Sequence, residues 1–230
     1  MSPDQSRHPI ELPFSAKYDP KHSQSYLEKH RGKLRRRLSN WRDQQLARRA
    51  LELAGQPQRV LDLPCGAGRF WRTLGEQPAR QIIAADNSAA MLDVALGNAD
   101  PEILKRVRPL QTSAFAIDLP DRSVDCVFCM RLLHHIGEAE HRLAMLREFH
   151  RVSRETVIVS LWVDGNYMAW RRRRQEARRS ARGKHGYQNR FVIPRATAEA
   201  EFAFAGFEIV ERLDFLPGQS MWRVYVLRRA

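Results

Sequence analysis

Residues 60–70 read VLDLPCGAGRF, a short apolar run followed directly by a proline and two glycines. The run is typical of a buried strand in a parallel sheet, and the glycines indicate a loop at its carboxyl end, where open α/β sheets bind ligands. Gly66 and Gly68 lack Cβ atoms where a ligand must approach the backbone, and Asp62 adds a carboxylate beside that approach. We therefore expect a ligand site at this loop.

Similar apolar runs occur further along the chain, at residues 80–86, 125–130 and 155–163. The stretches between them have helical character, with Ser88 as a candidate N-cap. Strands that alternate with helices predict βαβ units and a mostly parallel sheet. The segment TAEAEFAFAGF, residues 197–207, then predicts a helix that stops at Gly206, and the last residues alternate like a pair of antiparallel strands, 207–215 and 221–229.

The glycine pattern distinguishes between two classes of nucleotide ligand. A dinucleotide fold requires G-x-G-x-x-G, but Trp71 stands where the third glycine would be. Asp86, at the end of the second strand, is placed to accept hydrogen bonds from both hydroxyls of a ribose. Together these features favour an adenosine ligand without a pyrophosphate.

The segments VLDLPCGAGRF, AADNSAAML and SAFAIDLPDRSVDCVFCMRLLHHI resemble, in order, the motifs of the class I S-adenosylmethionine (SAM)-dependent methyltransferases. The resemblance covers residues 59–163 and 196–230. It implies an α/β fold, with a Rossmann-like, seven-stranded, mostly parallel sheet, an antiparallel final strand and a basic cap. The implied domains are a helical cap segment, residues 1–50, and a SAM-binding domain, residues 51–230, that carries a basic insert at 164–195.

The resemblance also implies SAM as the cofactor. Asp86 would hold the ribose and Asn87 would lie against the adenine, whose amino group the family usually binds through an aspartate. Ser113 occupies that position here, so we expect backbone groups of Ala114 and Phe115 to share in adenine recognition. The implied cofactor-binding residues are Asp62, Pro64, Gly66, Gly68, Asp86, Asn87, Ser113, Ala114, Phe115 and Met130.

Methyl transfer can also require a base for the acceptor's proton. His134 and His135 follow the fourth strand of the implied fold, and imidazole suits base work at neutral pH. Each could instead pack, cap the next helix or shape the pocket. We expect no metal, because no HExxH or comparable ligand cluster occurs. Cys126 and Cys129 spell CxxC within a strand, where they would point to opposite faces, so with Cys65 they are expected to be reduced thiols.

The net charge of +13 is concentrated in two segments. Residues 31–42 and 171–182 hold thirteen of the 39 basic residues and one of the 26 acidic residues, so the rest of the chain is nearly neutral. Both basic segments lie in the regions that are expected to cover the acceptor. They favour an anionic acceptor, namely RNA, a phosphorylated glycolipid such as a lipopolysaccharide component, or a nucleotide. The candidate anion-binding residues are Arg35, Arg36, Arg37, Arg174, Arg178 and Arg182.

Aromatic residues accompany both basic segments: Tyr26, Trp41, Trp162, Tyr167 and Trp170. They could stack on bases, lie at a membrane interface or pack in the core. Separately, the four-residue spacing of Arg174, Arg178 and Arg182 would form one stripe on a helix. This spacing resembles the arginine pair by which PilZ domains bind cyclic di-GMP, which makes a cyclic dinucleotide a candidate effector. A general anion contact and a solvated helix remain as alternatives.

Two function classes therefore stay open. The first is a methyltransferase that acts on an anionic acceptor. The second is a nucleotide-sensing or nucleic-acid-binding protein that keeps the SAM-binding fold with little or no catalysis. No apolar run of about eighteen residues and no secretory leader is present, so we expect a cytoplasmic protein without a transmembrane segment, with peripheral contact at the inner face of the membrane as an alternative. Neither the methylated atom, oxygen or nitrogen, nor the oligomeric state is indicated.

Overall fold

The computed structural model describes residues 34–181 and 189–230, with side chains from residue 37 onward. Tyr26 and Arg182 lie outside these ranges, as do the side chains of Arg35 and Arg36. Within the described part, no helix has the length and apolar character needed to cross a bilayer.

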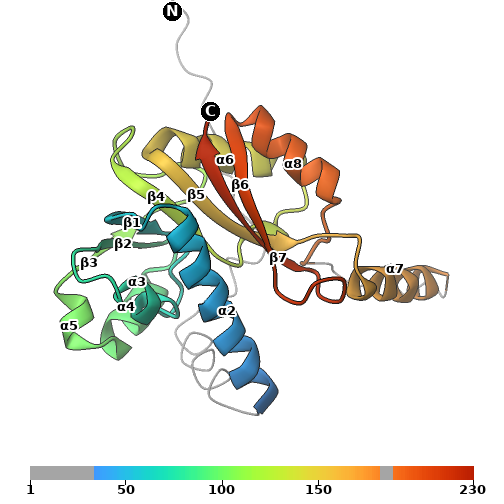
Figure 1. Cartoon of the computed structure of the whole chain (residues 1–230), viewed down its shortest axis with the longest axis horizontal. Coiled ribbons are helices and arrows are strands. Elements are labelled where there is room, and N and C mark those ends of the chain that lie inside the picture. The colour runs from blue at the N-terminus through green and yellow to red at the C-terminus, as the bar shows by residue number, and fades with distance from the viewer. Residues whose placement is uncertain (1–33, 182–188) are drawn as a thin grey trace, which may run out of the picture.

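One sheet organises the molecule, with its strands in the order β3-β2-β1-β4-β5-β7-β6 (Figure 1). Pairing is parallel from β3 to β5, whereas β7 pairs antiparallel with both β5 and β6. The predicted mostly parallel sheet with an antiparallel closing strand is therefore confirmed. The strands are β1 (Arg59–Asp62), β2 (Gln81–Asp86), β3 (Val107–Gln111), β4 (Val124–Cys129), β5 (Ser153–Trp162), β6 (Phe207–Asp214) and β7 (Trp222–Arg229).

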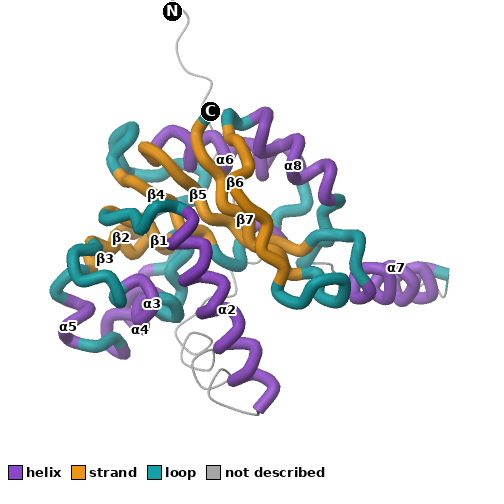
Figure 2. Tube along the Cα trace, viewed as in Figure 1, coloured by secondary structure: helices purple, strands orange, loops and turns teal. Residues whose placement is uncertain are grey.

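Helices cover both faces of the sheet (Figure 2). One face packs on α6 and α8, and the other on α2, α3 and α4. The two apolar cores explain why the strand sequences are continuously hydrophobic. The helices are α2 (Leu34–Leu53), α3 (Trp71–Leu74), α4 (Ala89–Asn98), α5 (Pro101–Leu104), the 3₁₀ helix η2 (Leu133–His135), α6 (Ala139–Val152), α7 (Tyr167–Ser180) and α8 (Arg195–Phe204).

Several local predictions hold in the structure. The Ser88 hydroxyl accepts a hydrogen bond from the Met91 N–H and caps α4. Cys126 packs in the core beneath α2 to α4, and Cys129 packs in the opposite core, so the two thiols do not share a face. Burial raises the pKa of Cys126 to about 12, as expected of an unreactive packed thiol.

Strand β3 was not located from the sequence. Its residues, Val107–Gln111, are half-buried or exposed, and Pro109 interrupts the apolar pattern. Proline is tolerated there because β3 is an edge strand that needs ladder bonds on one side only. Helix α2 also runs to Leu53, past the expected cap boundary at residue 50.

The insert after β5 projects from the body of the molecule as helix α7 (Figure 1). Ala169 is the buried residue of this helix within its described length. Asn166 caps its start by accepting a hydrogen bond from the Ala169 N–H at 2.9 Å. A helix that buries so little presents most of its side chains to solvent or to a partner.

Candidate functional site

The carboxyl ends of β1, β2, β4 and β5 meet at one edge of the sheet, because these strands are parallel neighbours. Asp62 ends β1, Asp86 ends β2, Met130 follows β4 and Trp162 ends β5. The structure therefore brings together residues that the sequence separates by up to a hundred positions. This edge is the candidate site.

Asp86 organises the glycine loop. Its carboxylate accepts hydrogen bonds from the Gly66 N–H and the Ser88 N–H, each at 3.0 Å. The Cys65 N–H also bonds to the Ala85 carbonyl at 2.8 Å, which holds the loop against β2. Gly66 has φ +53, a conformation that side chains rarely adopt. A glycine is therefore needed at this point of the loop.

Gly68, in the same loop, leaves room for the Trp71 ring to pack against the backbone. A Cβ at this position would lie 3.0 Å from the Trp71 ring. The buried Trp71 indole in turn donates a hydrogen bond to the Asp62 carboxylate at 3.1 Å. Trp71, which replaces the third glycine of a dinucleotide fold, thus fills the space behind the loop and orients Asp62.

Both aspartates are carboxylates held by neutral donors. Burial raises the pKa of Asp62 well above its usual range, and it also raises the pKa of Asp86. Among the described residues neither forms a salt bridge with a basic side chain. Buried carboxylates without a counter-ion suit a ligand that brings hydroxyl donors or a positive charge.

The predicted adenine contacts Ser113, Ala114 and Phe115 lie in the turn after β3. The Ser113 hydroxyl accepts a hydrogen bond from the Phe115 N–H at 3.2 Å, so these two predicted contacts bond to each other. Gln111, at the end of β3, donates from its amide to the Asn87 carbonyl at 3.3 Å. Gln111 was missed because it belongs to the strand that the sequence did not reveal.

The two histidines lie in η2 and differ in environment. His134 is buried, and burial, with His135, Arg190 and Arg131 nearby, lowers its pKa to about 2. His135 donates from Nδ1 to the Asn189 carbonyl at 2.6 Å, which leaves the lone pair of the neutral ring on Nε2. Burial also lowers the pKa of His135. The low pKa makes His134 a poor proton acceptor, whereas the bond to Asn189 leaves the Nε2 lone pair of His135 unprotonated in the neutral ring.

Helix α2 covers this edge through one carboxylate. The Asp43 side chain forms salt bridges with both Arg69, of the glycine loop, and Arg131, which follows β4. Arg69 also donates to Asn40 at 2.8 Å, and Gln44 donates to the Arg69 carbonyl at 3.1 Å. This cluster ties α2 to both loops that frame the site.

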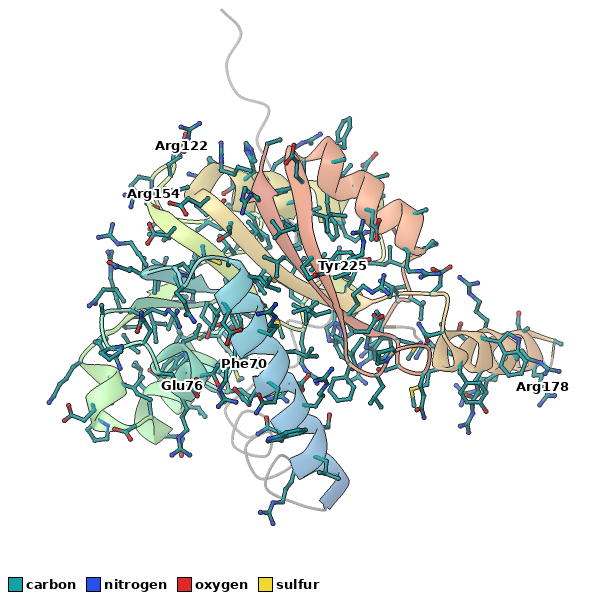
Figure 3. All side chains as sticks on the ribbon, in the orientation of Figure 1. Phe70, Glu76, Arg122, Arg154, Arg178 and Tyr225 are labelled. Atoms are coloured by element: carbon teal, nitrogen blue, oxygen red, sulfur yellow. The ribbon has the colours of Figure 1, made fainter. Side chains whose placement is uncertain are left out.

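Three of the predicted anion-binding arginines have described side chains, on α2 and α7. Arg37 is exposed on α2, and Arg174 and Arg178 are exposed on α7, where Arg178 points away from the body (Figure 3). Exposed aromatic side chains accompany them: Trp41 (58% exposed), Tyr167 (53%) and Trp170 (52%). Trp162, by contrast, is buried at 8%. The first three aromatics are surface residues, whereas Trp162 belongs to the site edge.

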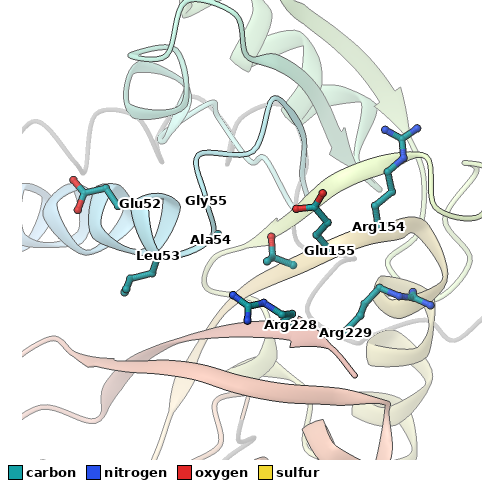
Figure 4. A pocket seen from close by; sticks show the side chains of 9 residues that line it. Glu52, Leu53, Ala54, Gly55, Arg154, Glu155, Arg228 and Arg229 are labelled. Atoms are coloured by element: carbon teal, nitrogen blue, oxygen red, sulfur yellow. The ribbon is translucent and has the colours of Figure 1, made fainter.

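A separate hollow of about 490 Å³ lies at the opposite end of the sheet, where β5 begins and β7 ends (Figure 4). Its charged lining residues are Glu52, Arg154, Glu155, Arg228 and Arg229. It is remote from the glycine loop. Among the described residues, no group of three or more His, Cys, Asp or Glu side chains is placed to hold a metal ion.

The fold resembles solved methyltransferase structures. The magnesium protoporphyrin IX methyltransferase of Synechocystis was solved with bound S-adenosylhomocysteine (SAH), the demethylated product of SAM. It superimposes with a TM-score of 0.72 at 15% identity, and the match covers 94% of this chain and 99% of that chain. A SAM-dependent methyltransferase of Aquifex aeolicus gives a TM-score of 0.63 at 19% identity, over 93% and 100% of the two chains. Residues 60–156 also match the family model described as a methyltransferase domain. Residues 60–156 are therefore similar to the methyltransferase-domain family, and the chain shares the fold of these solved methyltransferases.

Part of the chain is also similar to curated proteins that are named as methyltransferases. A tRNA U34 carboxymethyltransferase of Shewanella frigidimarina is 32% identical over 114 residues, which is 46% of this chain and 32% of that protein. An uncharacterized methyltransferase of Schizosaccharomyces pombe is 38% identical over 94 residues, 40% of this chain and 34% of that protein. The chain spans about a third of the length of these relatives.

Proposed function

We propose that this protein is a SAM-dependent methyltransferase that acts on an anionic acceptor, with RNA as the best supported class. The observation that carries the proposal is the Asp86 carboxylate, held at the end of β2 by the Gly66 and Ser88 amides. It lies beside a glycine loop in a domain whose solved neighbours include a methyltransferase with bound SAH.

The residues present fit SAM. A carboxylate has about four acceptor positions, so Asp86 can accept from ribose hydroxyls while it keeps its two amide bonds. Burial raises the pKa of Asp62, and the cationic part of a bound cofactor beside it would favour the ionised carboxylate and lower that pKa again. When bound, SAM supplies a methyl group made electrophilic by its sulfonium. The protein's share is to align the donor with the acceptor and to exclude water.

His135 is the candidate base. Its bond to the Asn189 carbonyl fixes the tautomer in which Nε2 can accept a proton, and its lowered pKa keeps the ring neutral at physiological pH. His134 packs against His135 with ring centroids 4.0 Å apart. We assign His134 to holding that ring and shaping the pocket.

The acceptor proposal depends on charge and exposed rings. Helix α7 exposes Tyr167 and Trp170 in its first turn and then carries arginines at Arg171, Arg172, Arg173, Arg174, Arg178 and Arg179. Arg174 stacks on Trp170 at 4.8 Å. Arginines beside exposed aromatic rings suit phosphates and unstacked bases. Several matching relatives are named as tRNA-modifying enzymes, which agrees with an RNA acceptor.

A phosphorylated glycolipid or a free nucleotide would also suit the positive charge of the α7 arginines. A glycolipid acceptor would add peripheral contact with the membrane. The sensing alternative would keep SAM binding without turnover. Incubation with labelled SAM and fractionated cell extract separates these cases: we expect label in the RNA fraction. Label in the lipid fraction would contradict the RNA acceptor, and SAM binding without label in any fraction would support the sensing alternative.

A further inference from the structure

Buried polar atoms without a hydrogen-bond partner gather beside the candidate site. Among the described residues these include Arg131 Nε, His134 Nδ1 and Trp162 Nε1. Buried polar groups are nearly always paired in folded proteins, so each exception requires an explanation. Three exceptions in one place indicate that a partner is supplied from outside the chain.

Two of these residues, His134 and Trp162, belong to a cluster of aromatic rings, and Arg131 lies against it. His134 lies 5.0 Å from Trp162 and 4.7 Å from Trp222, centroid to centroid, and the two indoles lie 5.5 Å apart. Trp162 and Trp222 are direct cross-strand partners at the ends of β5 and β7. The rings therefore have fixed positions on the sheet.

Three guanidinium groups surround these rings. Arg131 lies over Trp222 at 4.4 Å, and Arg172 and Arg190 lie over Trp162 at 5.1 and 5.8 Å. They come from three separate segments, of which two belong to the insert after β5. The positive charge and burial together depress the pKa of His134. This convergence of cations on aromatic faces is suited to an anion with a planar ring.

The cluster is joined to the proposed cofactor site. Arg131 shares the Asp43 carboxylate with Arg69 of the glycine loop. The Arg131 backbone has φ +67, which is uncommon for a residue other than glycine, and its N–H bonds to the Ser160 hydroxyl at 2.8 Å. A group bound at the cluster would thus lie next to the methyl donor.

We propose that this cage, formed by His134, Trp162, Trp222, Arg131, Arg172 and Arg190, binds the base and phosphate of one unstacked nucleotide of the acceptor. The inference rests on the proposed function and narrows its substrate. The indole faces stack on the base, the Trp162 N–H donates to a base carbonyl, and His134 completes the edge contacts. Arg172 and Arg190 turn from the Trp162 face to the phosphate, for which Arg172 exchanges its salt bridge with Glu176 at 2.7 Å.

The test measures binding of a labelled five-residue oligouridylate by fluorescence anisotropy. An abasic ribose-phosphate oligomer of equal length serves as the second probe, because it keeps the charge and removes the bases. For Trp162→Leu and Trp222→Leu we expect about tenfold weaker binding of oligouridylate and unchanged binding of the abasic oligomer. Trp162→Phe keeps a ring of similar shape and is expected to bind with an intermediate affinity, which guards against loss by misfolding.

A matched pair elsewhere in the chain provides the control. Arg147 lies over Phe204 at 5.6 Å, on α6 and α8. Arg147→Gln and Phe204→Leu should leave both probes unaffected, whereas Arg172→Gln should weaken both. The proposal is wrong if the cage variants bind oligouridylate as tightly as the unchanged protein does. It is also wrong if the cage residues are needed for binding to anionic phospholipid vesicles and not for binding to oligouridylate.

SAH calorimetry on the same proteins separates this inference from the proposed function. If SAH binds normally and the cage substitutions leave oligouridylate binding unchanged, the cage proposal is wrong and the proposed methyltransferase function stands. Absence of SAH binding in the unchanged protein rejects the methyltransferase, whatever the cage binds.

Discussion

Asp43 of α2 and Arg131, 88 positions later and just after β4, form a salt bridge at the edge of the sheet. Arg69 binds the same carboxylate, so one side chain of the cap helix holds both loops that frame the site. The Asp43 side chain is only 6% exposed, which makes this ion cluster largely desolvated. The position of the cap is therefore coupled to the geometry of the site.

Asp43→Asn should destabilise the protein and weaken SAH binding. It leaves two guanidinium groups without their carboxylate, and breaking a buried pair in this way lowers the free energy of unfolding by about 3–5 kcal/mol. Urea denaturation measures the effect. Glu52→Gln on the same helix is the control, because its salt bridge with Arg49 is about half exposed and should change stability little. Similar losses in both variants would contradict the role given to Asp43.

Asp62→Asn should stabilise the fold at neutral pH and weaken SAH binding. Burial raises the folded-state pKa of Asp62 above its unfolded value, so the ionised carboxylate opposes folding above the folded pKa. The stability difference between the variant and the unchanged protein should therefore be largest at neutral pH and diminish as pH falls towards about 4. Urea denaturation across this range tests it. If Asp62→Asn is less stable than the unchanged protein at pH 7, the ionised Asp62 carboxylate does not destabilise the fold.

His135→Gln should reduce the methyl-transfer rate while SAH affinity stays nearly unchanged. The reason is that Gln cannot accept a proton, although its amide can still donate to the Asn189 carbonyl. Single-turnover kinetics with the labelled RNA fraction, together with calorimetry, gives both quantities. A parallel loss of rate and SAH affinity would indicate a structural histidine.

Arg178→Ala distinguishes an effector site on α7 from a general anion contact. Arg174 and Arg178 are exposed and lie four residues apart in α7, and Arg178 is labelled in Figure 3. For a general contact, which our account favours, RNA affinity should fall modestly and depend steeply on salt. Arg154→Ala, at the far end of the sheet, is the control (Figure 4). Salt-resistant binding of cyclic di-GMP that Arg178→Ala abolishes, with weaker binding of GMP, would establish the effector instead.

Much of the site could be predicted because its signals are local. The apolar run, the glycines and the aspartate at the end of β2 each follow from short patterns, and the structure places Asp62 and Asp86 together at the predicted edge. Ser113 was also located, but its bond to the Phe115 N–H depends on the conformation of the turn, which a single residue type does not specify.

The remaining features depend on contacts between distant segments. The Asp43–Arg131 pair and the Trp162–Trp222 pair join residues far apart in the chain, and no periodicity links them. For Trp162 the sequence left stacking on bases, a membrane interface and core packing open, and the structure buries it where β5 meets β7. Burial of a single aromatic residue is decided by the tertiary fold.

The central claim is that Asp86 binds the ribose of SAM. Isothermal titration calorimetry with S-adenosylhomocysteine (SAH), the demethylated product, on the unchanged protein and on Asp86→Ala tests it most directly. We expect the unchanged protein to bind, and the variant to lose about 1.5–3 kcal/mol of binding free energy, the contribution of a hydrogen bond to a charged group, with an unchanged circular dichroism spectrum. Equal affinity in the two proteins, or no binding by either, would contradict the account.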